Sequence, residues 1–300
     1  MAARILVTGG CGFIGANLVV ALNRQGADVS ILDIREAHPL LGGFAGAMHR
    51  ADVGEVDDDF VHGFDAVLHQ AACTDTTVTD GAEMRERNVV PFRRLLSIAA
   101  RTGTDLVYAS SAAVYGNSPV PHRVGAGERP LNAYGESKLE MDEIARASIA
   151  DGSPSKIIGL RYFNVFGRGE DHKAHMASMI TKLSFDMRAG RRPRLFRDGE
   201  QRRDHVYVAD VVAANLRALA APRASSGIYN VGTGNAVSFN EVVATLNATL
   251  GTHLEAEYIE NPHRGYQDHT QADLTEARAV LGYQPAYDVV SAVRDYLAAP

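Results

Sequence analysis

Three glycines near the start of the chain constrain its fold more than any other feature. Gly9, Gly12 and Gly15 lie in "VTGGCGFIG", directly after the apolar run "RILVTG" and at the start of the helical pattern "FIGANLVVALNRQG". A strand, a glycine turn and a helix in this order let backbone N–H groups and a helix N-terminus face a pyrophosphate. The chain is therefore predicted to open with a dinucleotide-binding unit, and a turn without a ligand is the simpler alternative.

Strand and helix patterns alternate after this unit. Apolar runs typical of buried strands occupy residues 27–33, 64–72, 104–111 and 155–165, and helical patterns lie at about 81–101 and 132–150. Parallel strands need a helix in each connection, so the pattern predicts an α/β fold with a Rossmann-like, doubly wound parallel sheet. The second half mixes short strands and helices. It is predicted to form a smaller C-terminal lobe over the carboxyl edge of the sheet.

Composition argues against several other classes of protein. The formal net charge is −6 and no block of Lys or Arg stands out, which argues against nucleic acid as a partner. No apolar run approaches the roughly 20 residues that span a bilayer, and the N-terminal residues lack a signal-peptide pattern. The two cysteines, Cys11 and Cys73, give no disulfide framework. We expect a cytoplasmic protein that has no membrane partner.

An acidic and a basic residue follow the second predicted strand. Asp33 ends this strand 18 residues after Gly15 and would bind the adenosine ribose hydroxyls, which favours NAD. Arg35 lies two residues further on and would meet a 2′-phosphate, which favours NADP. The sequence leaves both cofactors open.

A tyrosine and a lysine share one face of a predicted helix. Tyr134 and Lys138 are four residues apart in "NAYGESK", one turn of helix. Free tyrosine has a pKa of about 10, which a neighbouring ammonium and a positively charged nicotinamide ring would lower. Tyr134 would then take a hydroxyl proton as hydride leaves the same carbon, while Ser111 holds the substrate oxygen. The alternatives are an ordinary helix surface for the pair and a helix cap for the serine.

These motifs resemble those of the short-chain dehydrogenase superfamily. The Gly-x-x-Gly-x-x-Gly spacing, the "HQAA" segment after a strand and Asn88 on the next helix carry the resemblance. It implies a tightly bound NAD or NADP. The implied cofactor contacts are Gly9, Gly12, Phe13, Ile14, Gly15, Asp33, Ile34, Arg35, Gln70, Ala71, Ala72, Cys73, Thr74, Asn88, Tyr134, Lys138 and Val165.

The distance from Ser111 to Tyr134 narrows the resemblance. It is 23 residues, as in the extended branch of the superfamily, which acts on nucleotide sugars. This implies a dinucleotide-binding Rossmann domain at residues 1–163. Residues 164–300 would mainly form the nucleotide-sugar-binding lobe, with some segments returning to the Rossmann domain. Sugar 4,6-dehydratases of this branch have an Asp-Glu pair where this chain has Ala112 and Ala113, so a dehydratase is disfavoured.

Four longer stretches resemble the ADP-L-glycero-D-manno-heptose 6-epimerases, over nearly the whole chain. They are "HQAACTDTT", "RYFNVFGRGEDHKAHMASM", "RRDHVYVADV" and "RGYQDHTQADLT". The resemblance implies an isomerase of lipopolysaccharide biosynthesis that oxidises C6 of ADP-D-glycero-D-manno-heptose to a ketone and returns hydride to the other face. Because the intermediate turns over in the site, a base is needed on each side. Tyr134 is one, and Lys173 matches the second base of the family.

The same resemblance implies the substrate contacts and a homo-oligomer. The contacts are Ser111, Asn164, His175, Lys182, Phe196, Arg197, Asp198, Gly199, Arg203 and Tyr266. A guanidinium grips two phosphate oxygens at once, so Arg203 suits a diphosphate. The alternative for Arg203 is a salt bridge to Asp204 or Asp210.

Two histidines beside Lys173 suggest another kind of site. His172 and His175 are three residues apart, but no third ligand is indicated, and we expect no metal. Two other functions stay open. One is another nucleotide-sugar epimerase or reductase, such as a UDP-hexose 4-epimerase. The other is a non-catalytic dinucleotide sensor, a class that often lacks the tyrosine or lysine present here.

Overall fold

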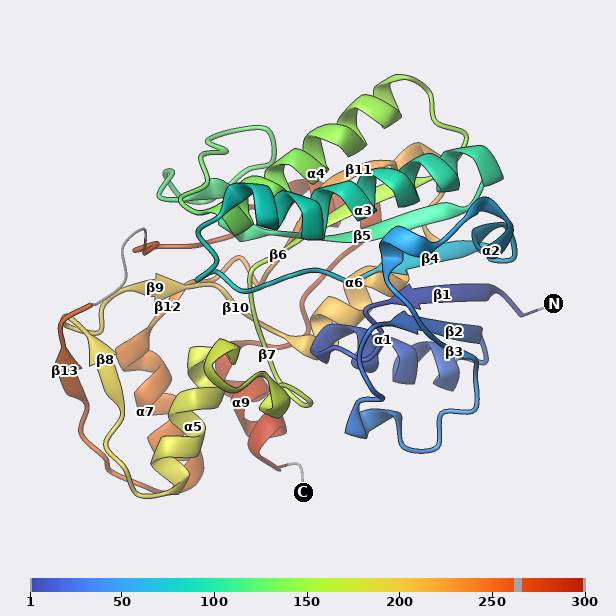
Figure 1. Cartoon of the computed structure of the whole chain (residues 1–300). Coiled ribbons are helices and arrows are strands. Elements are labelled where there is room, and N and C mark those ends of the chain that lie inside the picture. Colours follow the sequence, from blue (N-terminus) through green and yellow to red (C-terminus); the bar gives the residue numbers. More distant parts are fainter. Residues whose placement is uncertain (1, 262–265, 299–300) are drawn as a thin grey trace.

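A computed structural model describes residues 2–261 and 266–298, except for the side chains of residues 172, 174 and 175. Within these residues, a seven-stranded parallel sheet forms the centre of the molecule (Figure 1). Its strands are, in spatial order, β11 (Gly227–Val231), β6 (Ile157–Tyr162), β5 (Asp105–Ser111), β4 (Ala66–His69), β1 (Arg4–Thr8), β2 (Asp28–Asp33) and β3 (Met48–Arg50). The strand order reverses between β1 and β4. The predicted Rossmann-like, doubly wound fold is confirmed.

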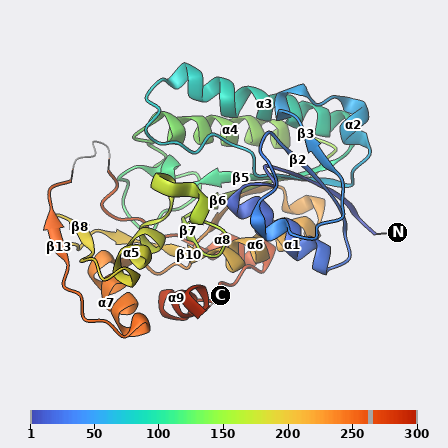
Figure 2. The same ribbon diagram turned by 60° about the horizontal axis from the view of Figure 1, so that its bottom comes forward.

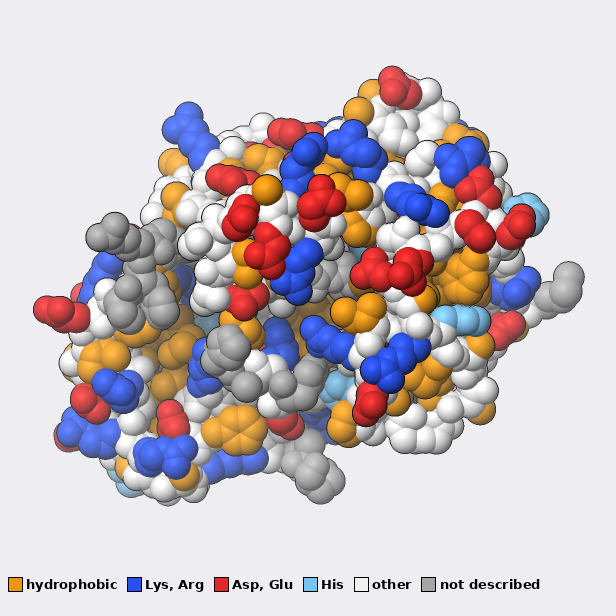
Figure 3. All heavy atoms as spheres, viewed as in Figure 1, with side chains coloured by type: hydrophobic (Ala, Val, Ile, Leu, Met, Phe, Trp, Pro, Cys, Tyr) orange, Lys and Arg blue, Asp and Glu red, His pale blue; other side chains and the backbone are white. Residues whose placement is uncertain are grey.

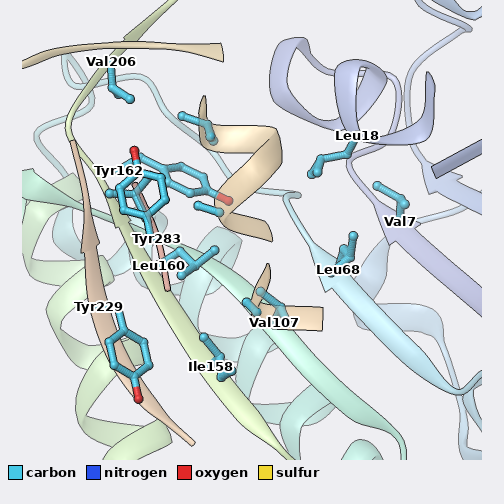
Figure 4. Packing of buried hydrophobic residues seen from close by; sticks show 14 of the residues in the cluster. Val7, Leu18, Leu68, Val107, Ile158, Leu160, Tyr162, Val206, Tyr229 and Tyr283 are labelled. Atoms are coloured by element: carbon cyan, nitrogen blue, oxygen red, sulfur yellow. The ribbon is translucent and has the colours of Figure 1, made fainter. Parts of the chain in front are cut away.

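Helices cover both faces of this sheet (Figures 1 and 2). One face carries α2 (Asp58–His62), α3 (Gly81–Thr102) and α4 (Ala133–Ala150), and the other carries α1 (Phe13–Arg24) and α6 (Val208–Ala220). Each strand contributes side chains to two hydrophobic cores, one on each face of the sheet, because successive side chains of a strand point to opposite faces. Val7 and Leu68 pack with Leu18 of α1 (Figure 4), whereas Leu6 and Val67 pack on the side of α3 and α4.

A smaller lobe lies beside the sheet unit. Its helices are α5 (Met179–Arg188), α7 (Phe239–Leu250) and α9 (Val289–Ala298). Its strands form the pairs β7 (Asn164–Phe166) with β10 (His205–Tyr207), β8 (Arg194–Phe196) with β13 (Glu257–Ile259), and β9 (Arg202–Arg203) with β12 (Val237–Ser238). Phe166, Leu183, Leu195, Val242 and Val293 belong to a separate core that holds this lobe together.

Some elements of the second half of the chain pack on the large sheet. α6 lies against α1, β11 extends the sheet beyond β6, and α8 (Thr275–Leu281) packs beside β11. The boundary between residues 163 and 164 stays a prediction. Figure 3 shows acidic and basic side chains interspersed over the face of the sheet unit that carries α3. No helix in the described part of the chain is long and apolar enough to cross a membrane.

Candidate active site

The glycine loop lies at the carboxyl end of β1, next to the point where the strand order reverses. Ligands of open α/β sheets bind at this point. Gly9 has φ +69°, and a Cβ on it would lie 2.5 Å from the backbone nitrogen of Ala71. A Cβ on Gly15 would lie 2.1 Å from the Gly9 carbonyl oxygen. Both positions therefore need glycine, because the loops after β1 and β4 and the first turn of α1 approach each other closely.

This loop has the features that a dinucleotide pyrophosphate requires. The N-cap of α1 is Gly12, which offers no side-chain hydrogen bond to the N–H groups of the first turn. Asp33 is buried at the end of β2, and its carboxylate accepts from the backbone nitrogens of Cys11 and Arg35, each at 2.9 Å. Asp33 thus fixes the loop, while Ile34 (61% exposed) and Arg35 stand on the surface beside it. The residues fit an NAD-type cofactor.

Two of the predicted cofactor residues use their side chains inside the protein. Asn88 is buried on α3, accepts from the Cys73 nitrogen at 2.7 Å, and donates to the Cys73 oxygen at 3.0 Å and to Ser137 Oγ at 3.1 Å. The side chain of Gln70 accepts from the Tyr162 hydroxyl and donates to Asn215. Asn88 therefore ties the loop after β4 to α4, and both side chains are engaged within the protein.

Ser111, Tyr134 and Lys138 lie together at the carboxyl end of β5. The side chain of Ser111 caps the following turn by accepting from the Ala113 nitrogen at 3.1 Å, and it also acts to lower the pKa of the Tyr134 hydroxyl. The Nζ atom of Lys138 lies 5.9 Å from the centroid of the Tyr134 ring and donates to the Ala109 carbonyl oxygen at 2.8 Å. The structure therefore brings together the three residues whose chemistry the sequence suggested.

The electrostatics of this group differ from the prediction at the tyrosine. Burial lowers the pKa of Lys138 to about 8, although the charges of Asp142 and Cys73 oppose this shift. Burial also raises the pKa of Tyr134 above its usual value, and the hydrogen bond from Ser111 only partly offsets it. The neighbouring lysine alone therefore does not lower the tyrosine pKa, and the lowering expected from a positively charged nicotinamide ring stays a prediction. Lys138 lies beneath the ring and points to Ala109, so its ammonium does not contact the phenol oxygen.

Lys173 lies in the short 3-10 helix at Asp171–Met176, near the glycine loop. Its Nζ atom is 3.7 Å from Oε1 of Glu170 and 5.5 Å from the ring centroid of Phe13. Glu170 is fully buried and accepts from the backbone and hydroxyl of Ser178, each at 2.8 Å, and from Thr181. Among the residues that the structure describes, no contact joins Lys173 to Tyr134 or Ser111.

Lys182 lies close enough to Lys173 for the two positive charges to interact. Burial lowers the pKa of Lys182, the Glu170 charge raises it, and the positive charge of Lys173 lowers it further. Arg168 instead lies 3.8 Å from Asp295 on α9. The predicted substrate contact of His175, and the interpretation of His172 and His175 as metal ligands, fall on side chains outside the described residues.

Arg203 is 6% exposed and carries no carboxylate partner within the described parts of the chain. Its guanidinium donates to the backbone oxygens of Arg202, Gln267 and Asp268 and lies 4.7 Å from the Tyr266 ring centroid. Burial lowers its pKa. The alternative interpretation, a salt bridge to Asp204 or Asp210, was wrong. Both carboxylates are satisfied by backbone N–H groups, Asp204 by residues 233, 234 and 272 and Asp210 by residues 286 and 287.

Several of the other predicted substrate residues lie near Arg203, whereas Lys182 lies near Glu170 and Lys173. The Phe196 ring stands edge-on to Tyr266 at 5.7 Å, and Arg197 pairs with Asp268 at 2.9 Å. Gly199 has φ +74°, which closes the turn after β8. Oδ1 of Asp198 accepts from Gln201 at 3.2 Å, Oδ1 of Asn164 accepts from Thr270 at 3.1 Å, and Val165 packs between the two cores.

Comparison with known proteins identifies the family. Residues 5–232 match the model of the NAD dependent epimerase/dehydratase family. The chain is 42% identical to the ADP-L-glycero-D-manno-heptose-6-epimerase of Alkalilimnicola ehrlichii, over 98% of this chain and 96% of that protein. The chain belongs to the NAD-dependent epimerase/dehydratase family.

Solved structures of this epimerase/dehydratase family superpose closely. The crystal structure of the Helicobacter pylori ADP-L-glycero-D-manno-heptose-6-epimerase has a TM-score of 0.90 and 39% identity, and the match covers 99% of this chain and 95% of that one. MoeE5, solved with UDP-glucuronic acid and NAD, has a TM-score of 0.86 and 30% identity, with 97% and 96% covered. Membership of this family supports an NAD(P) cofactor for the chain.

For an NAD-dependent epimerase, the sequence analysis missed two acidic residues beside the proposed catalytic groups. Asp142 lies one helical turn after Lys138 and is fully buried. Glu170 lies three residues before Lys173 and is fully buried as well. Each acid lies three or four residues from its lysine, a spacing that places the two side chains on one helix face. This spacing alone does not indicate burial, because an acidic residue so placed usually lies on the surface.

Proposed function

We propose that the protein inverts C6 of ADP-D-glycero-D-manno-heptose to the ADP-L-glycero-D-manno form by transient oxidation and re-reduction. The observation that carries the chemistry is the grouping of Tyr134 with Ser111 and with Lys138 beneath its ring, beside the glycine loop. The similarity to two heptose 6-epimerases over almost the whole chain supports the substrate.

On one side of the sugar, Tyr134 takes the proton from the C6 hydroxyl and Ser111 holds the oxygen. When bound, the dinucleotide supplies the hydride acceptor and donor and, in its oxidised form, a positive charge. Burial keeps Tyr134 protonated in the protein alone, so the base forms only with the help of added positive charge. Lys138, fixed on the Ala109 carbonyl, contributes part of that charge.

On the other side, Lys173 is the proposed second acid/base. Its Nζ atom lies 3.7 Å from the buried Glu170 carboxylate, and a lysine ammonium is able to donate a proton to a carbonyl oxygen. The contact of Lys173 with Phe13 ties it to the cofactor loop. A charged Lys173 opposite a Tyr134 base suits a reaction in which each epimer is oxidised on one side and formed on the other.

The substrate diphosphate is proposed to lie on Arg203. A buried guanidinium without a carboxylate partner in the described chain is well suited to a dianionic group, because an Arg pairs two oxygens at once. Phe196, Arg197, Asp198, Gly199 and Tyr266 would surround the nucleotide. Asn164, Lys182 and His175 would complete the sugar side. The domain boundary, the homo-oligomer and the cytoplasmic location stay predictions.

One assay tests this function. Purified protein is incubated with ADP-D-glycero-D-manno-heptose, and the 6-epimer is resolved by chromatography, with Tyr134→Phe in parallel. We expect epimerisation by the natural protein and a loss of about 10²-fold or more in the variant, the scale of general acid–base catalysis. Conversion of UDP-galactose without conversion of the heptose would overturn the substrate, and an unimpaired Tyr134→Phe would overturn the base. The mass of the copurifying dinucleotide separates NAD from NADP.

A further inference from the structure

Three residues of helix α4, spaced one helical turn apart, contact strand β5. Tyr134 lies at the Ser111 side chain, and Lys138 donates to the Ala109 carbonyl. The third residue is Asp142. Its Oδ1 accepts from the Tyr108 hydroxyl at 2.8 Å. The three contacts therefore reach the strand segment that also ends in the serine of the proposed catalytic group.

Asp142 holds both side chains that flank the lysine's acceptor. Ser110 Oγ donates to its Oδ2 at 2.9 Å, and Tyr108 donates to its Oδ1. Ala109, whose carbonyl binds Lys138, lies between these two residues. The position of that carbonyl relative to α4 is therefore set by Asp142, one turn further along the same helix.

The charge of Asp142 is part of a buried network. Asp142 and Arg161 are both fully buried, and Arg161 Nε donates to Asp142 Oδ2 at 2.8 Å. Glu128 lies 2.6 Å from Arg161 Nη1 and 2.7 Å from Arg146. The negative charges of two acids are thus matched by the positive charges of two arginines. Buried ion pairs of this kind contribute little net stability relative to apolar residues, so stability alone does not account for them.

The network acts on the charge of Lys138. Burial lowers the pKa of Lys138, and the Asp142 carboxylate is the first influence that opposes this shift. Other titratable or charged groups face Lys138 or Asp142 from the surrounding elements, namely Tyr134, Cys73, His69, Tyr108 and Arg161. Burial and the Lys138 charge lower the pKa of His69 to about 3, so this histidine is neutral and adds no charge.

We propose that Asp142 is a positioning residue for the reaction: it fixes the Tyr108–Ser111 end of β5 against α4 and keeps Lys138 protonated beneath Tyr134. This inference rests on the proposed function of Tyr134 and Lys138. Asp142 touches neither substrate nor cofactor. It acts through the lysine and through the strand that presents Ser111.

The variant Asp142→Asn tests the proposal directly, because it removes the charge and keeps the size. The chain has only four lysines, so the Lys138 signal can be followed by NMR in protein labelled with ¹³C-lysine, with Lys138→Arg to assign it. We expect the Lys138 titration midpoint to fall by about one pH unit in Asp142→Asn. The matched control is Glu143→Gln, which removes the same charge from the next, exposed residue of α4 and should leave the midpoint unchanged. An unchanged midpoint in Asp142→Asn overturns the proposal.

Catalysis provides the second measurement. We expect kcat for epimerisation to fall about ten-fold in Asp142→Asn with KM and dinucleotide content preserved, and its alkaline limb to move to lower pH. A shifted midpoint with normal kcat overturns the positioning role. If the natural protein does not convert the heptose, the proposed function fails, while the NMR midpoint still tests the link between Asp142 and Lys138.

A second pair of variants covers the case in which Asp142→Asn does not fold. Tyr108→Phe and Ser110→Ala each remove one hydrogen bond to Asp142 and leave its carboxylate in place. Each should lower kcat by about three-fold, because the segment of β5 that presents Ser111 is then held less firmly against α4. Normal kcat in both variants overturns the proposal.

Discussion

The Nζ atom of Lys173 lies 3.7 Å from Oε1 of Glu170, and the same carboxylate binds Ser178 at the start of α5. One buried acid therefore contacts both Lys173 and the first residues of the helix that carries Lys182. The segment from Gly167 onward is also attached to the cofactor side, because Asn17 of α1 donates to the Arg168 carbonyl at 2.9 Å. The proposed second acid/base is thus held between the two units of the molecule.

Replacing Lys173 tests this arrangement. Lys173→Ala should lower kcat by about 10²-fold, because one of the two proton-transfer groups is lost. The bound dinucleotide should remain, since the glycine loop is untouched. Lys182→Ala is the matched control from the same cluster and should raise KM with a smaller effect on kcat. Steady-state kinetics and the dinucleotide content measure both. Normal kcat in the Lys173→Ala protein would show that Lys173 is an ordinary surface lysine.

Arg203→Lys tests the proposed diphosphate site. A lysine keeps the charge but cannot pair two oxygens at once, so KM for the nucleotide sugar should rise by about 10-fold or more. The matched control is Arg191→Lys, at an exposed arginine that pairs with Asp186 on the surface. Calorimetric titration with ADP measures the loss of affinity without turnover. Equal affinity for ADP in the two variants contradicts the assignment.

Gly15→Ala tests the close approach in the glycine loop. The added Cβ would lie 2.1 Å from the Gly9 carbonyl oxygen, so the loop must move. We expect the purified variant to contain little or no dinucleotide and to melt at a lower temperature. Gly81→Ala is the control, because a Cβ at the start of α3 meets nothing within 4 Å. Alanine there should be neutral or slightly stabilising. A Gly15→Ala protein with full dinucleotide content refutes the close-packing argument.

His205 makes stability depend on pH. It is 4% exposed, and neither ring nitrogen has a hydrogen-bond partner among the described residues. Burial and the charge of Arg203 lower its pKa to about 3. The unfolded chain takes up a proton near pH 6.5 while the folded protein does not, so stability is present above that pH and is lost as the pH falls towards 3.

The variant His205→Phe removes this dependence. Between about pH 7.5 and about pH 5.5, the natural protein should lose about 1 kcal/mol of unfolding free energy through His205, and the variant should not lose this contribution. Urea denaturation at the two pH values measures this loss. His253→Gln, at an exposed histidine, serves as the control and should follow the natural protein. Parallel pH curves for all three proteins would exclude a titrating contribution from His205.

The parts of the site that sequence could predict are those fixed by local spacing. The Gly9–Gly15 loop lies within one turn and Tyr134 and Lys138 within one helix, and the structure shows both as expected. The partners of Arg203 could not be inferred in this way, because its guanidinium binds carbonyls more than 60 residues away. The same holds for Asp142, whose partners lie on β5 and β6. The spacing of Tyr134 and Lys138 also could not show that burial, a property of the whole fold, raises the tyrosine pKa.

The return of α6, β11 and α8 to the large sheet has a consequence for dissecting the protein. A fragment ending near residue 163 would lose β11 and leave β6, a strand whose residues are all buried in the whole protein, as an unpaired edge open to association with other chains. It would also lose Asn215, which bonds the Tyr162 hydroxyl. Neither lobe can therefore be exchanged for that of another protein without altering the other lobe. Altering substrate preference in this scaffold calls for point changes within an intact chain, because exchanging the smaller lobe would also remove part of the cofactor unit.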